Sequence, residues 1–140
     1  PQDTPNNLMI SMTNVAAGYL PAVHVLCNDY LTPDGTVVRD YIHVVDLAQE
    51  YLAALELLNK RPGWDAINLG MGQGASVFDM IKVFSLITGK DIPDVLEGRR
   101  SNDVASCYAS VQKAVDLMAL RVEKSLQDMY ESAWRWQRLK

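Results

Sequence analysis

The chain has 140 residues, of which 49% are hydrophobic, and this length and composition are typical of one globular domain over residues 1–140. The 13 basic and 17 acidic residues give a formal net charge of −4. That charge argues against nonspecific binding of nucleic acid, which needs a basic surface. No apolar run approaches the roughly 18 residues that cross a membrane, so a membrane partner is not expected.

The start of the chain, Pro1–Pro5, is polar and typical of a turn, so the sequence predicts no secretory signal peptide. The chain does not begin with Met, which indicates a fragment or a processed chain. Its two cysteines, Cys27 and Cys107, are too few for a disulfide framework. We expect both to be free thiols in a cytoplasmic protein.

The first elements are a helix, a strand and a loop. The helix is predicted over Leu8–Ala17, with Asn6 or Asn7 as its N-cap and Gly18 as the residue that ends it. A short apolar strand follows at Val23–Leu26. The loop from residue 28 to residue 35 contains Pro-Asp-Gly, which is a turn signal.

The central stretch combines a predicted strand with a predicted helix start. Residues 41–45 are aromatic and β-branched, which predicts a strand. Asp46 is the predicted N-cap of the next helix, with Gln49 completing a capping box. This helix, ending near Leu58, is predicted to bury the residues at helical spacing, namely Leu47, Ala48, Tyr51, Leu52, Leu55 and Leu58.

The second half of the chain continues the alternation of strands and helices. A short buried strand is predicted at Ala66–Leu69 and a weak one within residues 91–97. Three helices are predicted, with N-caps at Ser76, Ser110 and Ser125. The first, ended by Gly89, buries Val77, Met80, Ile81, Phe84 and Ile87; the second ends at Leu117; the third carries Met129, Trp134 and Trp136. The alternation predicts the α/β class.

A glycine-rich loop at residues 70–74 follows a predicted strand and opens a helix, as in a dinucleotide-binding fingerprint. That fingerprint also needs an acidic residue about 20 positions on, at the end of a second strand. Asp91 has the spacing, but the residues before it end a helix. We therefore interpret the loop as a strand-to-helix turn that needs small residues, and expect no cofactor-binding residue there.

One short motif, His24-x-x-Cys27, has the spacing of a metal-ligand pair. No second pair accompanies it, since the only other His and Cys are His43 and Cys107. A structural imidazole and a small thiol in the core explain these residues, so no metal site is expected.

Three arginines, Arg39, Arg99 and Arg100, stand in predicted loops that also carry Asp or Asn. Guanidinium groups match phosphate oxygens with two parallel hydrogen bonds, so two of these arginines could hold a diphosphate. Solvated surface charge, or a local pair between Arg39 and Asp40, explains the same residues equally well. The residue pattern alone leaves both interpretations open.

The stretch Arg39–Ala48, Arg-Asp-Tyr-Ile-His-Val-Val-Asp-Leu-Ala, resembles the UDP-glucose 4-epimerases of the extended short-chain dehydrogenase/reductase superfamily. Further segments fit this family in the same order, namely Pro5–Met9, Asn28–Tyr30, Asp34–Thr36, Asn68–Gly70 and Trp134–Gln137. The resemblance covers essentially the whole chain, but only the C-terminal part of such an enzyme. It implies the α/β substrate-binding part, which binds UDP or a UDP-hexose, without the N-terminal Rossmann domain.

The resemblance also implies the roles of individual residues. The matching arginines, Arg39 and Arg100, bind the UDP diphosphate in these enzymes, and Asn7 matches an amide that contacts the phosphates. Asp103 matches a carboxylate near the uridine ribose. Leu8, Leu26 and Val77 match the apolar and backbone wall around the uracil. Tyr41 matches a residue that lines the same cleft, and Cys107 matches a position that limits the size of the sugar.

Three positions depart from the family pattern. Arg100-Ser101-Asn102-Asp103 lacks a glycine that usually precedes the Asp, which can change the backbone angles of that loop. Cys27 stands where glycine is common, and Ala119-Leu120 replace a frequent Gly-Trp pair. These departures concern the ability of the chain to bind the substrate, and not its resemblance to the family.

Epimerisation in the resembling family uses NAD to take a hydride and return it, and a tyrosine acidified by a lysine four residues on. None of the 6 tyrosines of this chain has a lysine at that spacing, and the chain contains no Gly-x-x-Gly-x-x-Gly unit. We therefore expect no catalytic residue here, and NAD only in the complete enzyme.

Three hypotheses follow. The chain is the substrate-binding part of a UDP-glucose/UDP-galactose 4-epimerase, inactive alone; or a stand-alone nucleotide-sugar-binding or interaction domain; or part of another superfamily enzyme, such as a nucleotide-sugar dehydratase or decarboxylase. Pro5–Met9 favours the first over the third. In the resembling enzymes the helix after Asp46 lies against the cofactor-binding sheet, so self-association or a missing cofactor domain is expected.

Overall fold

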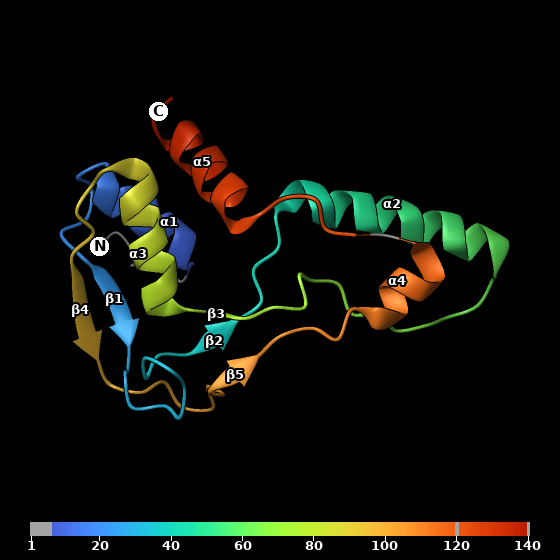
Figure 1. Cartoon of the computed structure of the whole chain (residues 1–140), viewed down its shortest axis with the longest axis horizontal. Coiled ribbons are helices and arrows are strands. Elements are labelled where there is room, and N and C mark those ends of the chain that lie inside the picture. The colour runs from blue at the N-terminus through green and yellow to red at the C-terminus, as the bar shows by residue number, and fades with distance from the viewer. Residues whose placement is uncertain (1–6, 120, 140) are drawn as a thin grey trace.

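The computed structural model describes residues 7–119 and 121–139, and it is elongated (Figure 1). At one end three helices pack beside two strands, α1 (Leu8–Ala16), α3 (Val77–Thr88) and α5 (Leu126–Gln137) with β1 (Val23–Leu26) and β4 (Asp94–Glu97). At the other end α2 (Val44–Lys60) packs on α4 (Gln112–Met118). Extended segments connect the ends, and in them lie β2 (Val38–Arg39), β3 (Ala75–Ser76) and β5 (Ser106–Cys107).

The strands form two small sheets. β1 and β4 pair in parallel, with Val23 opposite Asp94 and Leu26 opposite Glu97. β2 lies between β3, which is antiparallel to it, and β5, which is parallel. Helices and strands alternate, so the predicted α/β class is confirmed. Within the described ranges, no helix is long and apolar enough to span a membrane.

The hydrophobic core lies between α1, α3, α5 and β1. Met80, Phe84 and Tyr130 are all 0% exposed, and the Phe84 ring centroid lies 5.7 Å from that of Tyr130. The predicted apolar face of α3 is confirmed for four of its members, Val77, Met80, Ile81 and Phe84, while Ile87 is half-buried. Packing at this end therefore follows the helical periodicity of the sequence.

Most of the predicted helix caps are confirmed. The Asn7 side chain accepts from the N–H groups of Met9 and Ile10, which caps α1; Asn6 lies outside the described residues. Ser76 caps α3 and Ser125 caps α5, the latter in a reciprocal capping box with Asp128. The Ser110 cap is wrong, because α4 begins after Val111 and has no side-chain cap.

The predicted strand over residues 41–45 and the Asp46 cap are also wrong. The strand in this stretch is β2, which precedes Asp40, and α2 already begins at Val44. His43 is the N-cap, because its Nδ1 accepts from the Val45 N–H at 3.1 Å. Asp46 is 2% exposed, and its carboxylate accepts instead from the backbone N–H groups of residues 123 and 124.

The prediction that α2 buries its apolar face is wrong. Tyr51, Leu52 and Leu55 are 60%, 64% and 59% exposed. Leu58 and Ala48 are exposed as well, and Leu47 is half-buried. The fully buried residues of α2 are acidic, Asp46 and Glu50. Within the described chain, no packing element covers the apolar face of this helix.

The predicted strand Ala66–Leu69 does not form either. Residues 64–69 form neither a helix nor a strand. An extended segment becomes a strand only when a neighbour satisfies its backbone N–H and C=O groups. The described residues supply no such neighbour to this segment.

Ala119 gives a simple test of the backbone at the end of α4. It adopts φ +52° in the left-handed region, which costs a residue with a Cβ about 1 kcal/mol relative to glycine. We expect Ala119→Gly to raise the free energy of unfolding by about 1 kcal/mol, measured by denaturant titration. Ala48→Gly, on the exposed face of α2, is the control and should lower it by about 0.5–1 kcal/mol. A loss of stability in both variants would contradict the strain at Ala119.

Candidate functional site

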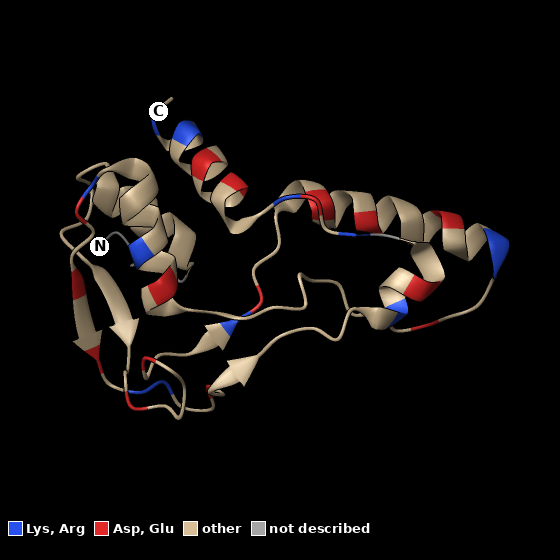
Figure 2. Ribbon diagram, viewed as in Figure 1, with Lys and Arg blue, Asp and Glu red and all other residues tan. Residues whose placement is uncertain are grey.

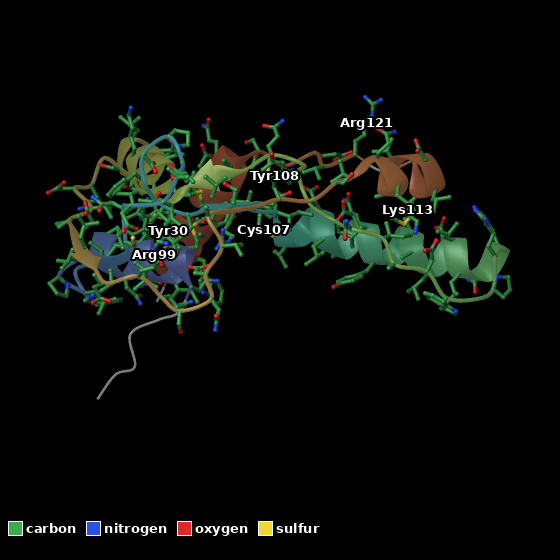
Figure 3. The ribbon with its side chains drawn as sticks, turned by 90° about the horizontal axis from the view of Figure 1, so that it is seen from below. Tyr30, Arg99, Cys107, Tyr108, Lys113 and Arg121 are labelled. Atoms are coloured by element: carbon green, nitrogen blue, oxygen red, sulfur yellow. The ribbon has the colours of Figure 1, made fainter. Side chains whose placement is uncertain are left out.

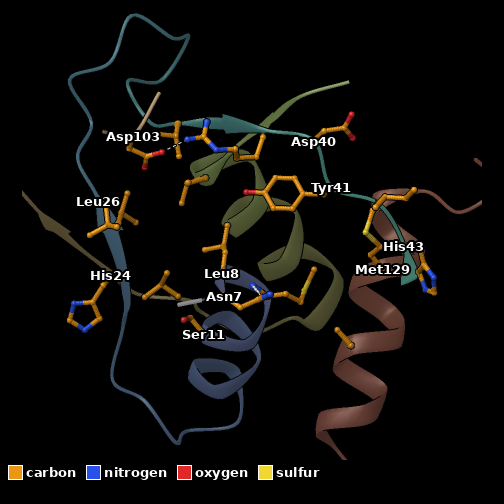
Figure 4. A pocket seen from close by; sticks show the side chains of 18 of the residues that line it. Asn7, Leu8, Ser11, His24, Leu26, Asp40, Tyr41, His43, Asp103 and Met129 are labelled. Carbon is orange, nitrogen blue, oxygen red and sulfur yellow. Dashed lines mark hydrogen bonds and ion pairs between the residues drawn. The ribbon is translucent and has the colours of Figure 1, made fainter. Parts of the chain in front are cut away.

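A cavity of about 1060 Å³ lies where α1, β1, α5 and the segment from β2 to α2 meet (Figure 4). All but one of the residues predicted to bind substrate line it, namely Asn7, Leu8, Leu26, Arg39, Tyr41, Val77, Arg100 and Asp103. The exception is Cys107, which is exposed on β5 and does not line this cavity. The fold thus brings together residues that are widely separated in the sequence.

Arg39 and Asp103 form an ion pair at one side of the cavity (Figure 4). Their side chains are only 27% and 20% exposed. The Arg39 Nη1 also donates to the carbonyl of Val38 at 2.8 Å. β2 and β5 hold the pair in place, since Val38 donates its N–H to the carbonyl of Ala105. A partly desolvated, oriented guanidinium of this kind is suited to bind an anion.

The other two candidate arginines have different environments. Arg99 binds the Asp29 carboxylate and carbonyl and stacks over the Tyr30 ring at 4.1 Å (Figure 3), so it fixes two loops to each other. The pKa of Asp29 is lowered by the hydrogen bond from the Cys27 thiol and then by Arg99. Arg100 lines the cavity and has no ion-pair partner among the described residues. The structure therefore separates Arg39 and Arg100 from Arg99.

Another part of the cavity wall is apolar and includes one edge of β1. Leu8, Leu26 and Val77 line it. Val23 and Cys27 donate their N–H groups to the carbonyls of Pro93 and Glu97, at 2.8 and 3.1 Å. Because alternate residues of a parallel strand point to opposite edges, the backbone groups of His24 and Leu26 face the other edge, where no described strand pairs. That edge can donate hydrogen bonds to a flat polar ring and accept hydrogen bonds from it.

Tyr41 divides this region from a second part of the cavity. Burial raises the pKa of Tyr41, although the nearby Arg39 lowers it, so its phenol stays protonated and able to donate at neutral pH. Beyond it the cavity is lined by His43, Met129, Ser132 and Trp136. Sequence reasoning missed this part, although the closing Trp134–Gln137 motif had marked α5 as significant.

His43 is the polar group that holds this second part together. Its Nδ1 accepts the Val45 N–H, so the ring proton is on Nε2, which lies 3.2 Å from Ser132 Oγ. The buried imidazole thus connects the start of α2 to α5. No signal in the sequence indicated this contact, because its partners are 89 residues apart.

The glycine-rich loop is held by Asp40, which sequence reasoning did not single out beyond a local pair with Arg39. Its carboxylate accepts from the N–H groups of Met71, Gly72 and Ala109 at 2.9, 3.0 and 3.1 Å. A Cβ at Gly70 would lie 2.5 Å from the Asp40 carboxylate, so this position needs glycine. Two N–H groups that a dinucleotide fingerprint would offer are therefore engaged.

The His24-x-x-Cys27 motif is divided between two interactions. His24 Nδ1 lies 2.5 Å from Glu97 Oε1, and the Cys27 thiol donates to Asp29. No group of 3 or more His, Cys, Asp or Glu suited to a metal ion occurs among the residues described. Cys27 has φ +77°, which explains why glycine would be favourable at this position.

Known proteins with similar sequences are UDP-glucose 4-epimerases. The chain is 45% identical over 137 residues to that enzyme of Bacillus subtilis (strain 168), covering 98% of this chain and 40% of the relative. It is 46% identical over 138 residues to the human enzyme, with coverages of 99% and 40%. The chain thus spans about 40% of the length of these relatives. No family model matches it.

Solved structures give the same similarity. The UDP-glucose 4-epimerase from Bifidobacterium longum in complex with NAD+ and UDP matches with a TM-score of 0.94 and 41% identity, over 100% of this chain and 42% of that one. The enzyme from Stenotrophomonas maltophila with bound NAD and formylated UDP-arabinopyranose matches with a TM-score of 0.94 and 42% identity, over 99% and 41%.

Proposed function

This chain is homologous to the C-terminal part of UDP-glucose 4-epimerases, and from this premise we propose that it binds the UDP moiety of a UDP-hexose, as the substrate-binding part of such an enzyme. The observation that carries the proposal is the single cavity that gathers Arg39, Arg100 and Asp103 beside an apolar wall. Residues 1–140 act as one substrate-binding domain in this proposal.

The diphosphate binds to Arg39 and Arg100. Arg39 is oriented by Val38 and Asp103, and Arg100 lines the same cavity. Two guanidinium groups supply enough donors for the charged oxygens of both phosphates. The Asn7 side chain already caps α1, so its amide lies at a helix N-terminus, where an anion is favoured.

The uridine binds to the apolar wall. Leu8, Leu26 and Val77 cover the faces of the base, and the open edge of β1 supplies backbone donors and acceptors for its polar atoms. The Asp103 carboxylate is bound by Arg39 on one side, and its remaining acceptor capacity suits the hydroxyls of a ribose. Tyr41, with its protonated phenol, lines the passage beyond.

The role of this chain in catalysis is to bind and orient the substrate. Both of the relatives described above contain NAD, and NAD supplies the hydride chemistry of the complete enzyme. No lysine lines the cavity of the described residues, and none follows a tyrosine of this chain at the catalytic spacing. The chain therefore depends on a further part for turnover.

The exposed apolar face of α2 supports the proposal that a further protein surface packs against this chain. Tyr51, Leu52 and Leu55 are all at least 59% exposed, and a face of this kind is favourable only when covered. A cofactor-binding part covers it in the proposed enzyme. A stand-alone nucleotide-sugar-binding domain is the second candidate function, and the same face then favours self-association.

Titration calorimetry of the chain with UDP and with uridine tests the proposed function. We expect UDP to bind more tightly than uridine, because the diphosphate contributes charge-assisted hydrogen bonds to Arg39 and Arg100. ADP, with the same diphosphate but another base, is the control and should bind more weakly than UDP. Absence of UDP binding, or equal affinity for UDP and ADP, would overturn the proposal.

Cys107 provides a prediction about the sugar. It lies on β5 opposite Arg39 in register, exposed near the middle of the molecule (Figure 3), and we propose that it faces the hexose in the complete enzyme. A thiol leaves room for an N-acetyl group, whereas a tyrosine ring fills that space. With this chain joined to the cofactor domain of an active epimerase, we expect Cys107→Tyr to abolish turnover of UDP-N-acetylhexosamines.

Turnover of UDP-galactose by the same variant is the control, and it should be largely retained. Loss of both activities would mean that Cys107 serves folding. No change in either activity would mean that Cys107 does not contact the sugar.

A further inference from the structure

The inner face of α2 is acidic, although it is the buried face. Asp46 and Glu50 are one helical turn apart, and they are 2% and 5% exposed. Asp40, from the segment before α2, is half-buried and raises the pKa of Glu50. Figure 2 shows the acidic bands along α2. Three carboxylates therefore lie between α2 and the rest of the chain.

Two of the three carboxylates have a clear structural role. Asp40 accepts from backbone N–H groups of residues 71–72 and 109, and Asp46 accepts from those of residues 123–124. These bonds attach the start of α2 to segments that have no regular secondary structure of their own. The position of α2 thus depends on buried polar contacts more than on apolar packing.

Glu50 has no comparable partner. Its Oε2 is buried and accepts no hydrogen bond within the described chain. Burial raises the pKa of Glu50, and the charges of Asp46 and then Asp40 raise it further. A buried carboxylate without a donor destabilises the surroundings that bury it. A neutral carboxyl at this position avoids that cost and gains an O–H donor.

The other charged groups on elements packed against α2 have their own interactions or lie on the adjoining segment. On α4, the Lys113 ammonium binds Asp65 and the Asp116 carboxylate accepts from Gln112. The segment at residues 121–124 carries Arg121, Glu123 and Lys124. None of these groups lowers the pKa of Glu50, which responds to burial and to the two aspartates.

We propose that Glu50 is a proton-controlled latch that sets how firmly α2 docks on the segment at residues 121–124, to which Asp46 attaches it. When Glu50 is protonated, Asp40, Asp46 and Glu50 together carry less negative charge, and α2 is held closely. With the proton lost, the unpartnered carboxylate favours opening of α2. Because α2 carries the exposed apolar face, this latch controls how that face is presented to a partner.

The sign of the pH dependence follows from the direction of the pKa change. A carboxyl whose pKa is raised by folding binds its proton more tightly in the docked state than in the open state. Docking is therefore firmest at mildly acidic pH and weakens as the pH rises through the raised pKa of Glu50. This proposal does not rest on nucleotide binding by the cavity.

Hydrogen exchange of the full chain, followed by mass spectrometry at pH 5 and pH 8, tests the latch. Exchange rates are divided by those of unstructured peptides at each pH, so that only protection is compared. For the wild type we expect α2 to be about fivefold or more better protected at pH 5, whereas α1 and α3 change little. In Glu50→Gln the protection of α2 should be high at both pH values.

Two further variants make the test decisive. Glu56→Gln, an exposed acid on the same helix, should keep the pH dependence of the wild type. Glu50→Ala should lose it even if the helix is less stable, since only the carboxyl titrates. A wild type without pH-dependent protection, or a Glu50→Gln variant that retains it, would overturn the proposal.

Discussion

Arg39→Ala is expected to weaken UDP binding by about 1.5–3 kcal/mol, which is roughly 10- to 150-fold in dissociation constant. The reason is the low exposure of the Arg39 side chain, 27%, and its fixed orientation against Val38 and Asp103. Removing it also leaves the Asp103 carboxylate without its ion-pair partner beside a second negative group, the diphosphate. Titration calorimetry of both proteins with UDP measures the change.

Arg99→Ala is the matched control, because Arg99 binds Asp29 and stacks on Tyr30 and does not line the cavity. It should leave the affinity for UDP nearly unchanged. The affinity of Arg39→Ala for uridine should also stay close to that of the wild type, since uridine has no phosphate. Equal affinity of wild type and Arg39→Ala for UDP would contradict the assignment of this arginine.

The isolated chain is expected to self-associate through α2, and Leu52→Glu together with Leu55→Glu should make it monomeric. These side chains are 64% and 59% exposed, so association removes apolar surface from water at about 25 cal/mol per Å². A charge at each position must be desolvated in the associated state, which opposes association. Sedimentation velocity over a range of concentrations measures the oligomeric state of both proteins.

Leu86→Glu is the control for this prediction. Leu86 is 75% exposed on α3, at the other end of the molecule from most of α2 (Figure 1), so its substitution should leave association unchanged. A wild-type chain that remains monomeric at high concentration would contradict the predicted association. Dissociation by Leu86→Glu but not by the α2 substitutions would place the interface elsewhere.

Local signals in the sequence determined much of this structure. Asn7, Ser76 and Ser125 cap helices where predicted, because a capping side chain bonds to backbone two or three residues away. The apolar face of α3 is buried as its periodicity predicted. The resemblance of the Arg39–Ala48 stretch to UDP-glucose 4-epimerases is also visible without any coordinates, and relatives of that name at 45% and 46% identity agree with it.

Only the tertiary structure decided the rest, because it depends on which surfaces are available as partners. The apolar face of α2 was predicted as buried but is exposed, and Ala66–Leu69 has no neighbouring strand. Asp46 was predicted as a cap but binds backbone 77 residues away. Likewise, the family resemblance pointed to Arg39 and Arg100, but only contacts between residues distant in the sequence show that Arg99 is bound to Asp29 and does not line the cavity. Periodicity reports which face of a segment is apolar, whereas burial requires another surface to pack against it.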